Sequence, residues 1–165
     1  DWLGIHEEML RDTVRVQAYR RAIMGNAALF RGRRVLEVGC GSGILSLFAA
    51  KAGAAVVYAV DSEAMCVEMT QKAAAANGFG DIIRPVTGRV DEVELPSKVD
   101  ILISEWMGYF LLYENMIDAV LEAQRRFLEP GGIVFPTTVE LFVAPFTDSP
   151  MEGERRRFWS DIGGP

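Results

Sequence analysis

Three glycines alternate with small residues directly after a run of strand-like composition. Residues 33–38 are rich in β-forming side chains, and Gly39, Gly41 and Gly43 follow them. Residues 44–51 then have the Leu, Phe and Ala content of a helix. A glycine backbone can approach a ligand without interference from a Cβ atom, and ligands bind beyond the carboxyl ends of parallel strands. The pattern therefore predicts a strand, a ligand-binding glycine loop and a helix.

An acid follows the next expected strand. Residues 55–60 form a second apolar run that ends at Asp61, 22 residues after Gly39. A carboxylate there can accept hydrogen bonds from both hydroxyls of a ribose, which indicates an adenosine-bearing cofactor. Ile44 stands where the dinucleotide fingerprint requires its third glycine, which disfavours NAD and suits a nucleoside without a pyrophosphate, such as S-adenosyl-L-methionine. A turn without a chemical role is the alternative for the glycines alone.

The rest of the chain continues to alternate between strands and helices. Helices are expected over 5–29, divided by a cap at Asp12, and over 62–77 and 115–128, and strands over 82–87, 99–104, 132–135 and 139–144. This alternation predicts an α/β fold with a mainly parallel sheet and helices on both faces. Only three residues, 136–138, separate the last two strands, so we expect these strands to form an antiparallel hairpin at the sheet edge.

The length of 165 residues fits one α/β domain with short additions. We expect residues 1–30 to form N-terminal helices over the cofactor site and residues 31–147 to form the cofactor-binding domain. Residues 148–165 look like a connecting helix that leads towards a further domain, because the segment ends in Gly-Gly-Pro after an Arg-rich helical stretch.

Composition excludes several classes of protein. The net charge of −6 argues against non-specific nucleic-acid binding, which needs a cationic field, and weakly favours a cationic partner. Two cysteines and one histidine cannot complete a four-ligand zinc site, so we expect neither a metal site nor a disulfide framework. The longest apolar stretch, at about 52–60, is too short to span a membrane, and the N-terminus has no signal-peptide form. We expect a soluble protein of a reducing compartment.

Two glutamates lie in an otherwise apolar segment, 104–116, after an expected strand. In a single helix, Glu105 and Glu114 would lie on opposite faces, because nine positions at about 100° each separate them. They can converge only if the intervening residues double back, with Gly108 as the pivot. Converging carboxylates repel unless a cation lies between them, which indicates a cationic substrate. The alternative is that Glu105 merely ends a strand and that Glu114 lies at a helix N-terminus.

Two further charged residues are candidate ligand contacts. Asp91 follows Val90 after the next expected strand, where it could accept a hydrogen bond from an adenine amino group or simply be a solvated turn acid. Arg15 lies near the start of the second helix and could face a ligand, or it could be a surface charge.

These motifs together resemble those of the protein arginine methyltransferases. The matching blocks are Gly4–Leu10, Asp12–Arg15, Val35–Leu45 and Ser104–Met116, and the similarity extends from Gly4 to about Trp159. The Ser-Glu-Trp-Met-Gly-Tyr block with its second glutamate is the most specific of them. The resemblance is to the asymmetrically dimethylating type I branch, and residues 141–145 look closest to its histone-modifying subtype six. It implies a Rossmann-like class I methyltransferase fold.

The resemblance also implies a role for each candidate residue. Glu105 and Glu114 would be the paired catalytic acids. The cofactor would be held by His6, Arg15 at its methionine carboxylate, Gly39 and Gly41 along its backbone, Asp61 at the ribose, and Val90 and Asp91 at the adenine. Met9 and Met116 would shape the pocket around the substrate arginine. Asp61 departs from the glutamate usual in the family, which shortens its reach.

The chemistry expected of such a site is methyl transfer to the guanidino nitrogen of a protein arginine, without a metal. Members of the family carry a C-terminal β-barrel with a dimerisation arm and a histidine that pairs with the residue found here as Asp12. The resemblance therefore implies the cofactor domain of a larger enzyme, a homodimer in full-length form, and arginine-rich substrates such as histones in the nucleus or cytoplasm. A non-catalytic S-adenosylmethionine-binding module, a truncated fragment lacking activity, and an NAD-dependent oxidoreductase are the alternatives.

Overall fold

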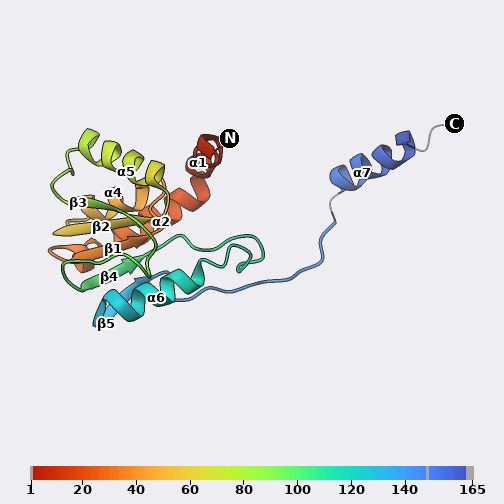
Figure 1. Cartoon of the computed structure of the whole chain (residues 1–165). Helices are drawn as coiled ribbons and strands as arrows, with labels where there is room; N and C mark the ends of the chain where they lie inside the picture. Colours follow the sequence, from red (N-terminus) through yellow and green to blue (C-terminus); the bar gives the residue numbers. More distant parts are fainter. Residues whose placement is uncertain (1, 148, 163–165) are drawn as a thin grey trace.

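The computed structural model describes residues 2–147 and 149–162. Its helices and strands follow the expected alternation (Figure 1), in the order α1 Trp2–Arg11, α2 Thr13–Gly25, α3 Ala27–Phe30, β1 Arg34–Val38, α4 Ile44–Lys51, β2 Val56–Asp61, α5 Ala64–Ala76, β3 Ile83–Thr87, β4 Val99–Ile103, α6 Ile117–Phe127, β5 Leu128–Phe135 and α7 Ser149–Ile162. Most expected bounds are right to within two residues, which confirms the α/β class.

The strands form one sheet in the order β3-β2-β1-β4-β5, and every neighbouring pair is parallel. Residues 35–38 of the central strand β1 are all buried, because helices cover both of its faces. The chain order reverses between β1 and β4, so their carboxyl ends border the crevice in which ligands bind in sheets of this kind. This crevice is where the glycine loop and Glu105 emerge.

Two apolar cores lie on the two faces of the sheet. On one face α2, α4 and α5 pack on the strands through residues such as Ile23, Ala49 and Ala74. On the other face α6 packs through Val120, Ala123 and Phe127. Figure 1 shows the single helix α6 on its own side of the sheet, opposite α4 and α5. The loops that leave the carboxyl ends of the strands are thereby held between rigid layers.

The expected antiparallel hairpin at the sheet edge is wrong. Strand β5 begins earlier than expected, pairs in parallel with β4 and ends at Phe135, and residues 139–147 form no strand. Pro136 follows β5 at once and has no N–H group for a ladder, and the connection lacks the Gly or Asn that tight hairpin turns favour. The chain instead runs away from the sheet to α7 (Figure 1).

The N-terminal helices divide where the sequence predicts. Asp12 caps α2, because its side chain accepts a hydrogen bond from the backbone N–H of Arg15 at 3.0 Å. The cap sets the direction of α2, whose inner face carries Arg15 and Tyr19 towards the crevice. Among the described residues, no helix is both long and apolar enough to cross a membrane.

Candidate functional site

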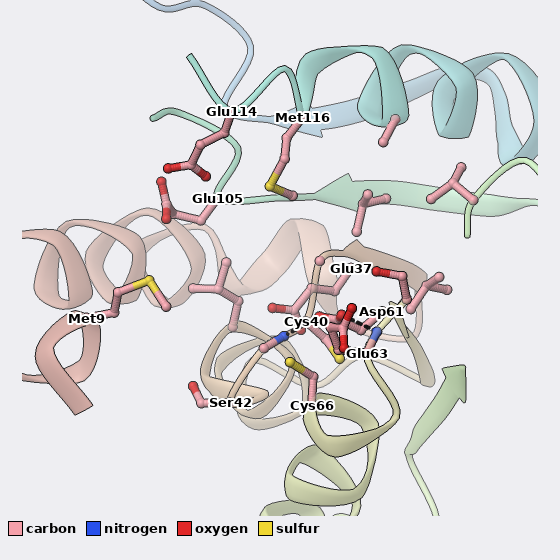
Figure 2. Close-up of a pocket in the computed structure, with 18 of the residues that line it drawn as sticks. Met9, Glu37, Cys40, Ser42, Asp61, Glu63, Cys66, Glu105, Glu114 and Met116 are labelled. Atoms are coloured by element: carbon pink, nitrogen blue, oxygen red, sulfur yellow. Dashed lines mark hydrogen bonds between the residues drawn. The ribbon is translucent and has the colours of Figure 1, made fainter. Parts of the chain in front are cut away.

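A cavity of about 890 Å³ opens at the carboxyl ends of β1, β2 and β4, a volume typical of a site for a small ligand. It is lined by all the sequence-predicted site residues, from His6 and Met9 on α1 to Met116 before α6. Figure 2 shows Met9, Asp61, Glu105, Glu114 and Met116 among them. Of the described lining residues, eight are acidic and two are arginines. The cavity therefore favours a ligand or substrate that carries positive charge.

The glycine loop forms one wall of this cavity. Gly39, Gly41 and Gly43 all have positive φ angles, which side-chain-bearing residues rarely adopt. A Cβ on Gly39 would lie 2.7 Å from Cε of Met116, and one on Gly41 would lie 3.2 Å from Cε1 of His6. The loop thus needs glycine both for its backbone angles and because His6 and Met116 close over it.

Asp61 is held at the end of β2 by backbone donors. Its Oδ2 accepts a hydrogen bond from the N–H of Gly41 at 2.9 Å, and its Oδ1 accepts one from the N–H of Glu63 at 3.0 Å. Each carboxylate oxygen can accept further hydrogen bonds. The arrangement joins the acid and the glycine loop in one unit and leaves acceptor capacity for ligand hydroxyls.

Val90 and Asp91 lie farther along the same cavity, in the loop after β3. Asp91 is exposed and pairs with Arg89, whose Nε lies 3.1 Å from Oδ1. This hydrogen bond lowers the pKa of the Asp91 carboxyl below its ordinary value. The side chain of Val90 is buried, and its carbonyl accepts a hydrogen bond from Arg126 of α6. The structure therefore places both residues at the cavity, with Asp91 engaged in a surface ion pair.

The segment after β4 doubles back, as convergence of the two glutamates requires. Gly108 and Leu111 exchange backbone hydrogen bonds of 3.2 and 3.0 Å across a tight reversal. Phe110, Leu111 and Asn115 have positive φ angles, which cost on the order of 1–3 kcal/mol each in residues other than glycine. Backbone strain of this kind concentrates at functional sites.

The reversal brings the carboxylates of Glu105 and Glu114 together (Figure 2). The side chain of Glu114 lies against Gly108, where a Cβ would meet its Cγ at 2.8 Å. Burial raises the pKa of Glu105, the cation of Arg15 opposes this rise, and the charge of Glu114 adds to it. The two acids therefore interact electrostatically, and a cation between them would relieve their repulsion.

Arg15 of α2 binds one of the two glutamates. Its Nη1 donates a hydrogen bond to Oε2 of Glu105 at 3.1 Å, and both side chains are partly buried. Tyr19, one helical turn later, donates its hydroxyl to the carbonyl of Ser104 at 2.9 Å. Tyr19 is not among the residues predicted from the sequence, although its spacing of four residues from Arg15 places both on one helix face.

Glu37 is a second residue of the site that is not among those predicted from the sequence. It belongs to β1, is 1% exposed and accepts a hydrogen bond from the hydroxyl of Ser46. Burial raises its pKa to about 8, so the carboxyl is mostly protonated at neutral pH. A glutamate inside an otherwise apolar strand was the available signal, because such acids are rarely buried without a reason.

His6 and Met9 approach the cavity from α1. Nε2 of His6 lies 3.7 Å from Sγ of Cys66, and the ring covers Gly41. Figure 2 shows Met9 and Met116 on different elements around the cavity. Cys40 is buried, and burial raises the pKa of its thiol, which fits a filler of the loop rather than a reactive nucleophile.

Comparisons with known proteins agree with this geometry. A family model described as "Ribosomal protein L11 methyltransferase (PrmA)" matches residues 23–135, so the chain belongs to that group of methyltransferases. Over 165 aligned residues, 99% of this chain, it is 50% identical to "Protein arginine N-methyltransferase 1" of Saccharomyces cerevisiae, of which 47% is covered. The chain is a member of the protein arginine N-methyltransferase family.

Solved structures of family members share the fold. A Trypanosoma brucei PRMT1 enzyme-prozyme heterotetrameric complex with AdoHcy has a TM-score of 0.78 and 50% identity, over 81% of this chain and 42% of that one. Protein arginine methyltransferase 10 of Arabidopsis thaliana has a TM-score of 0.87 and 39% identity, over 96% and 45%. The chain thus spans about half the length of the curated relatives and the solved family structures that it matches.

Proposed function

We propose that this protein transfers a methyl group from S-adenosyl-L-methionine to a guanidino nitrogen of a protein arginine. The observation that carries the proposal is the meeting of Glu105 and Glu114 at the mouth of a cavity whose other end has the features of a nucleoside site. Paired carboxylates recognise the planar guanidinium group with its several N–H donors.

The residues present fit the cofactor. Asp61 offers acceptor oxygens for two ribose hydroxyls, and the glycine loop gives a bed free of side chains. The contact with Glu105 uses one of the five N–H donors of Arg15, so others can bind a carboxylate at the methionine end. The acidic lining favours a sulfonium cation over a neutral ligand. When bound, the cofactor supplies the activated methyl group.

The glutamates solve the central chemical difficulty. A guanidinium stays protonated and delocalises its nitrogen lone pairs, so it is a poor nucleophile. Hydrogen bonds to Glu105 and Glu114 concentrate positive charge on some of its nitrogens and leave electron density on the nitrogen that faces the methyl donor. Arg15 and Tyr19 hold the Glu105 end of the loop in place, so the reactants meet in a preset orientation.

The substrates and assembly follow from the same reasoning. An acidic cavity fits arginine-rich segments such as histone tails, and the resemblance of residues 141–145 favours subtype six. The curated relatives are about twice as long, which supports a larger enzyme in which this chain forms the cofactor domain and residues 149–162 lead to the next domain. The heterotetrameric assembly of the Trypanosoma brucei relative supports a homodimer of the full-length protein. The nucleus and the cytoplasm are the compartments that such substrates imply.

Calorimetry with S-adenosylhomocysteine, followed by methyl transfer to a Gly-Arg-rich peptide, tests the proposal. We expect Glu105→Gln and Glu114→Gln to keep cofactor affinity and to lower methyl transfer by about 100-fold or more, because the amide cannot offer charge to the guanidinium. Glu140→Gln, a change on an exposed segment, serves as the control.

The outcomes separate the remaining possibilities. Because the relatives are about twice as long, the assay includes a chimera in which this chain replaces the matching residues of the Saccharomyces cerevisiae relative. Cofactor binding without transfer in both proteins would leave only a non-catalytic binding module. Full activity of both glutamine variants would contradict the roles of the glutamates.

A further inference from the structure

Arg126, in the last turn of α6, holds the loop that follows β3 although 36 positions separate it from Val90. Its Nη1 donates to the backbone carbonyl of Val90, and its Nη2 donates to Oε1 of Glu94 at 2.8 Å. Its Cζ lies 4.7 Å from the ring centroid of Phe127. The side chain is only 17% exposed, so this guanidinium is part of the fold rather than a solvated charge.

The loop that follows β3 needs a side chain from another element to satisfy one of its backbone carbonyls. Gly88 donates its N–H to the carbonyl of Asp61 at 2.8 Å, and the carbonyl of Arg89 accepts the N–H groups of Glu92 and Val93. The carbonyl of Val90 points instead to α6, where Arg126 satisfies it. A buried carbonyl without a partner would cost about 1–3 kcal/mol, so this contact sets the orientation of the peptide group between Val90 and Asp91.

The hydrogen bond from the Arg126 guanidinium to the Val90 carbonyl also affects the N–H group of the same peptide unit. A charge-assisted hydrogen bond to a carbonyl polarises the whole peptide unit, which strengthens the N–H on its far side as a donor. In the Val90–Asp91 peptide, that N–H belongs to Asp91 and hydrogen-bonds the carboxylate of Asp91 itself. Asp91 lines the cavity. A carboxylate held in this way can accept a hydrogen bond from the amino group of an adenine.

We propose that Arg126 is a positioning residue for the cofactor's base, because it orients and polarises the Val90–Asp91 peptide, whose N–H holds the Asp91 carboxylate at the cavity. This inference rests on the proposed function, since it assumes an adenosine-bearing cofactor. It adds a link between the two halves of the site, because α6 carries Arg126 at one end and follows Met116 and the Glu114 loop at the other.

A lysine cannot replace Arg126 in this role. The arginine contacts a carbonyl and a carboxylate at once through two different nitrogens and lies over a neighbouring ring, which depends on its planar fork. A lysine ammonium keeps the charge but not this geometry. Arg126→Lys therefore separates orientation from charge, and it stays informative if Arg126→Ala fails to fold.

The experiment measures how well the chain discriminates between bases. Binding of S-adenosylhomocysteine and of S-inosylhomocysteine, in which a 6-oxo group replaces the amino group and N1 becomes protonated, is measured by calorimetry. We expect Arg126→Ala and Arg126→Lys to weaken S-adenosylhomocysteine roughly tenfold or more and to bring the two dissociation constants closer together. A merely structural role would weaken both compounds alike and leave their ratio unchanged.

Arg125→Ala on the same turn is the matched control, because Arg125 is 73% exposed and pairs only across the helix surface with Glu122 among the described residues. We expect it to change neither constant by more than about twofold. If both Arg126 variants keep the base preference of the unsubstituted chain, the inference fails while the proposed function stands. An unsubstituted chain that binds neither compound overturns both.

Discussion

The nucleoside half of the cavity and the glutamate loop, residues 104–116, are built in opposite ways. The nucleoside half joins buried parallel strands to the glycine loop, and backbone groups satisfy one another, as where Gly39 and Cys40 both donate to the carbonyl of Val60. The glutamate loop exposes Tyr109 and Phe110 and holds several residues at positive φ. It is positioned by side chains from elsewhere, chiefly Arg15 and Tyr19.

Because of this difference, we expect substitutions in the two regions to have different effects. A change in the nucleoside half disturbs buried backbone and should be seen first in stability. A change in the glutamate loop moves carboxylates near the surface and should be seen first in turnover, because a displacement of about 1 Å can cost 100-fold in rate. The predictions that follow test that division.

The largest expected effect is the pH dependence of stability caused by Glu37. Its pKa is 4.5 as an ordinary side chain and about 8 in the fold, so between these values the folded state keeps a proton that the unfolded chain has lost. The free energy of unfolding should fall as pH rises through this range, by up to about 5 kcal/mol. Glu37→Gln should remove this fall in urea titrations from pH 5 to 9. An equal slope in both proteins would contradict the buried protonated state.

The next largest effect separates backbone strain from crowding in the glycine loop. Gly43 has φ of +77°, and a Cβ there would lie 2.7 Å from Oγ1 of the buried Thr70, so we expect Gly43→Ala to cost about 2–4 kcal/mol of stability. Gly78→Ala is the matched control, because Gly78 has φ of +76° with nothing within 4 Å. It should cost only about 1 kcal/mol in the same urea titration. Equal losses would show that Thr70 is not the constraint.

Gly108→Ala should act on turnover rather than on stability. Gly108 does not have a positive φ angle, so an alanine there causes no backbone strain. Its methyl group would meet the flexible end of Glu114 at 2.8–2.9 Å. The carboxylate should move away, which lowers methyl transfer by roughly tenfold and leaves cofactor affinity unchanged. Gly25→Ala, with open space around it, should be silent in both assays. A large loss of stability in Gly108→Ala would break the distinction between the two regions.

The smallest expected effect is that of Tyr19, which holds the start of the glutamate loop from α2. Tyr19→Phe removes the hydroxyl that donates to the carbonyl of Ser104 and should lower the free energy of unfolding by about 1 kcal/mol. It should also lower methyl transfer beyond what that loss explains, because the carbonyl precedes Glu105. Tyr109→Phe, at a side chain that is 85% exposed, provides the control for both measurements.

Local patterns predicted the part of the site that local structure makes. The glycines between a strand and a helix, and Asp61 at the end of the next strand, lie where the alternation of elements places them. Residues 139–144 show the limit of such patterns, because their composition predicts a strand that does not form. Whether an edge strand forms depends on a partner for its N–H groups, which a run of residue types cannot reveal.

By itself, the sequence determined the α/β class, the cap at Asp12, the glycine loop and the acid that follows β2, because each depends on neighbours within a few positions. It also established that Glu105 and Glu114 meet only if the chain reverses at Gly108. Only the tertiary structure decided that they do meet, that Arg15 and Tyr19 support Glu105, and that Arg126 holds Val90. The contacts of Arg15, Tyr19 and Arg126 join positions 36 to 90 residues apart. Such distant contacts depend on side-chain packing, which cannot be inferred from the spacing of residues along the chain.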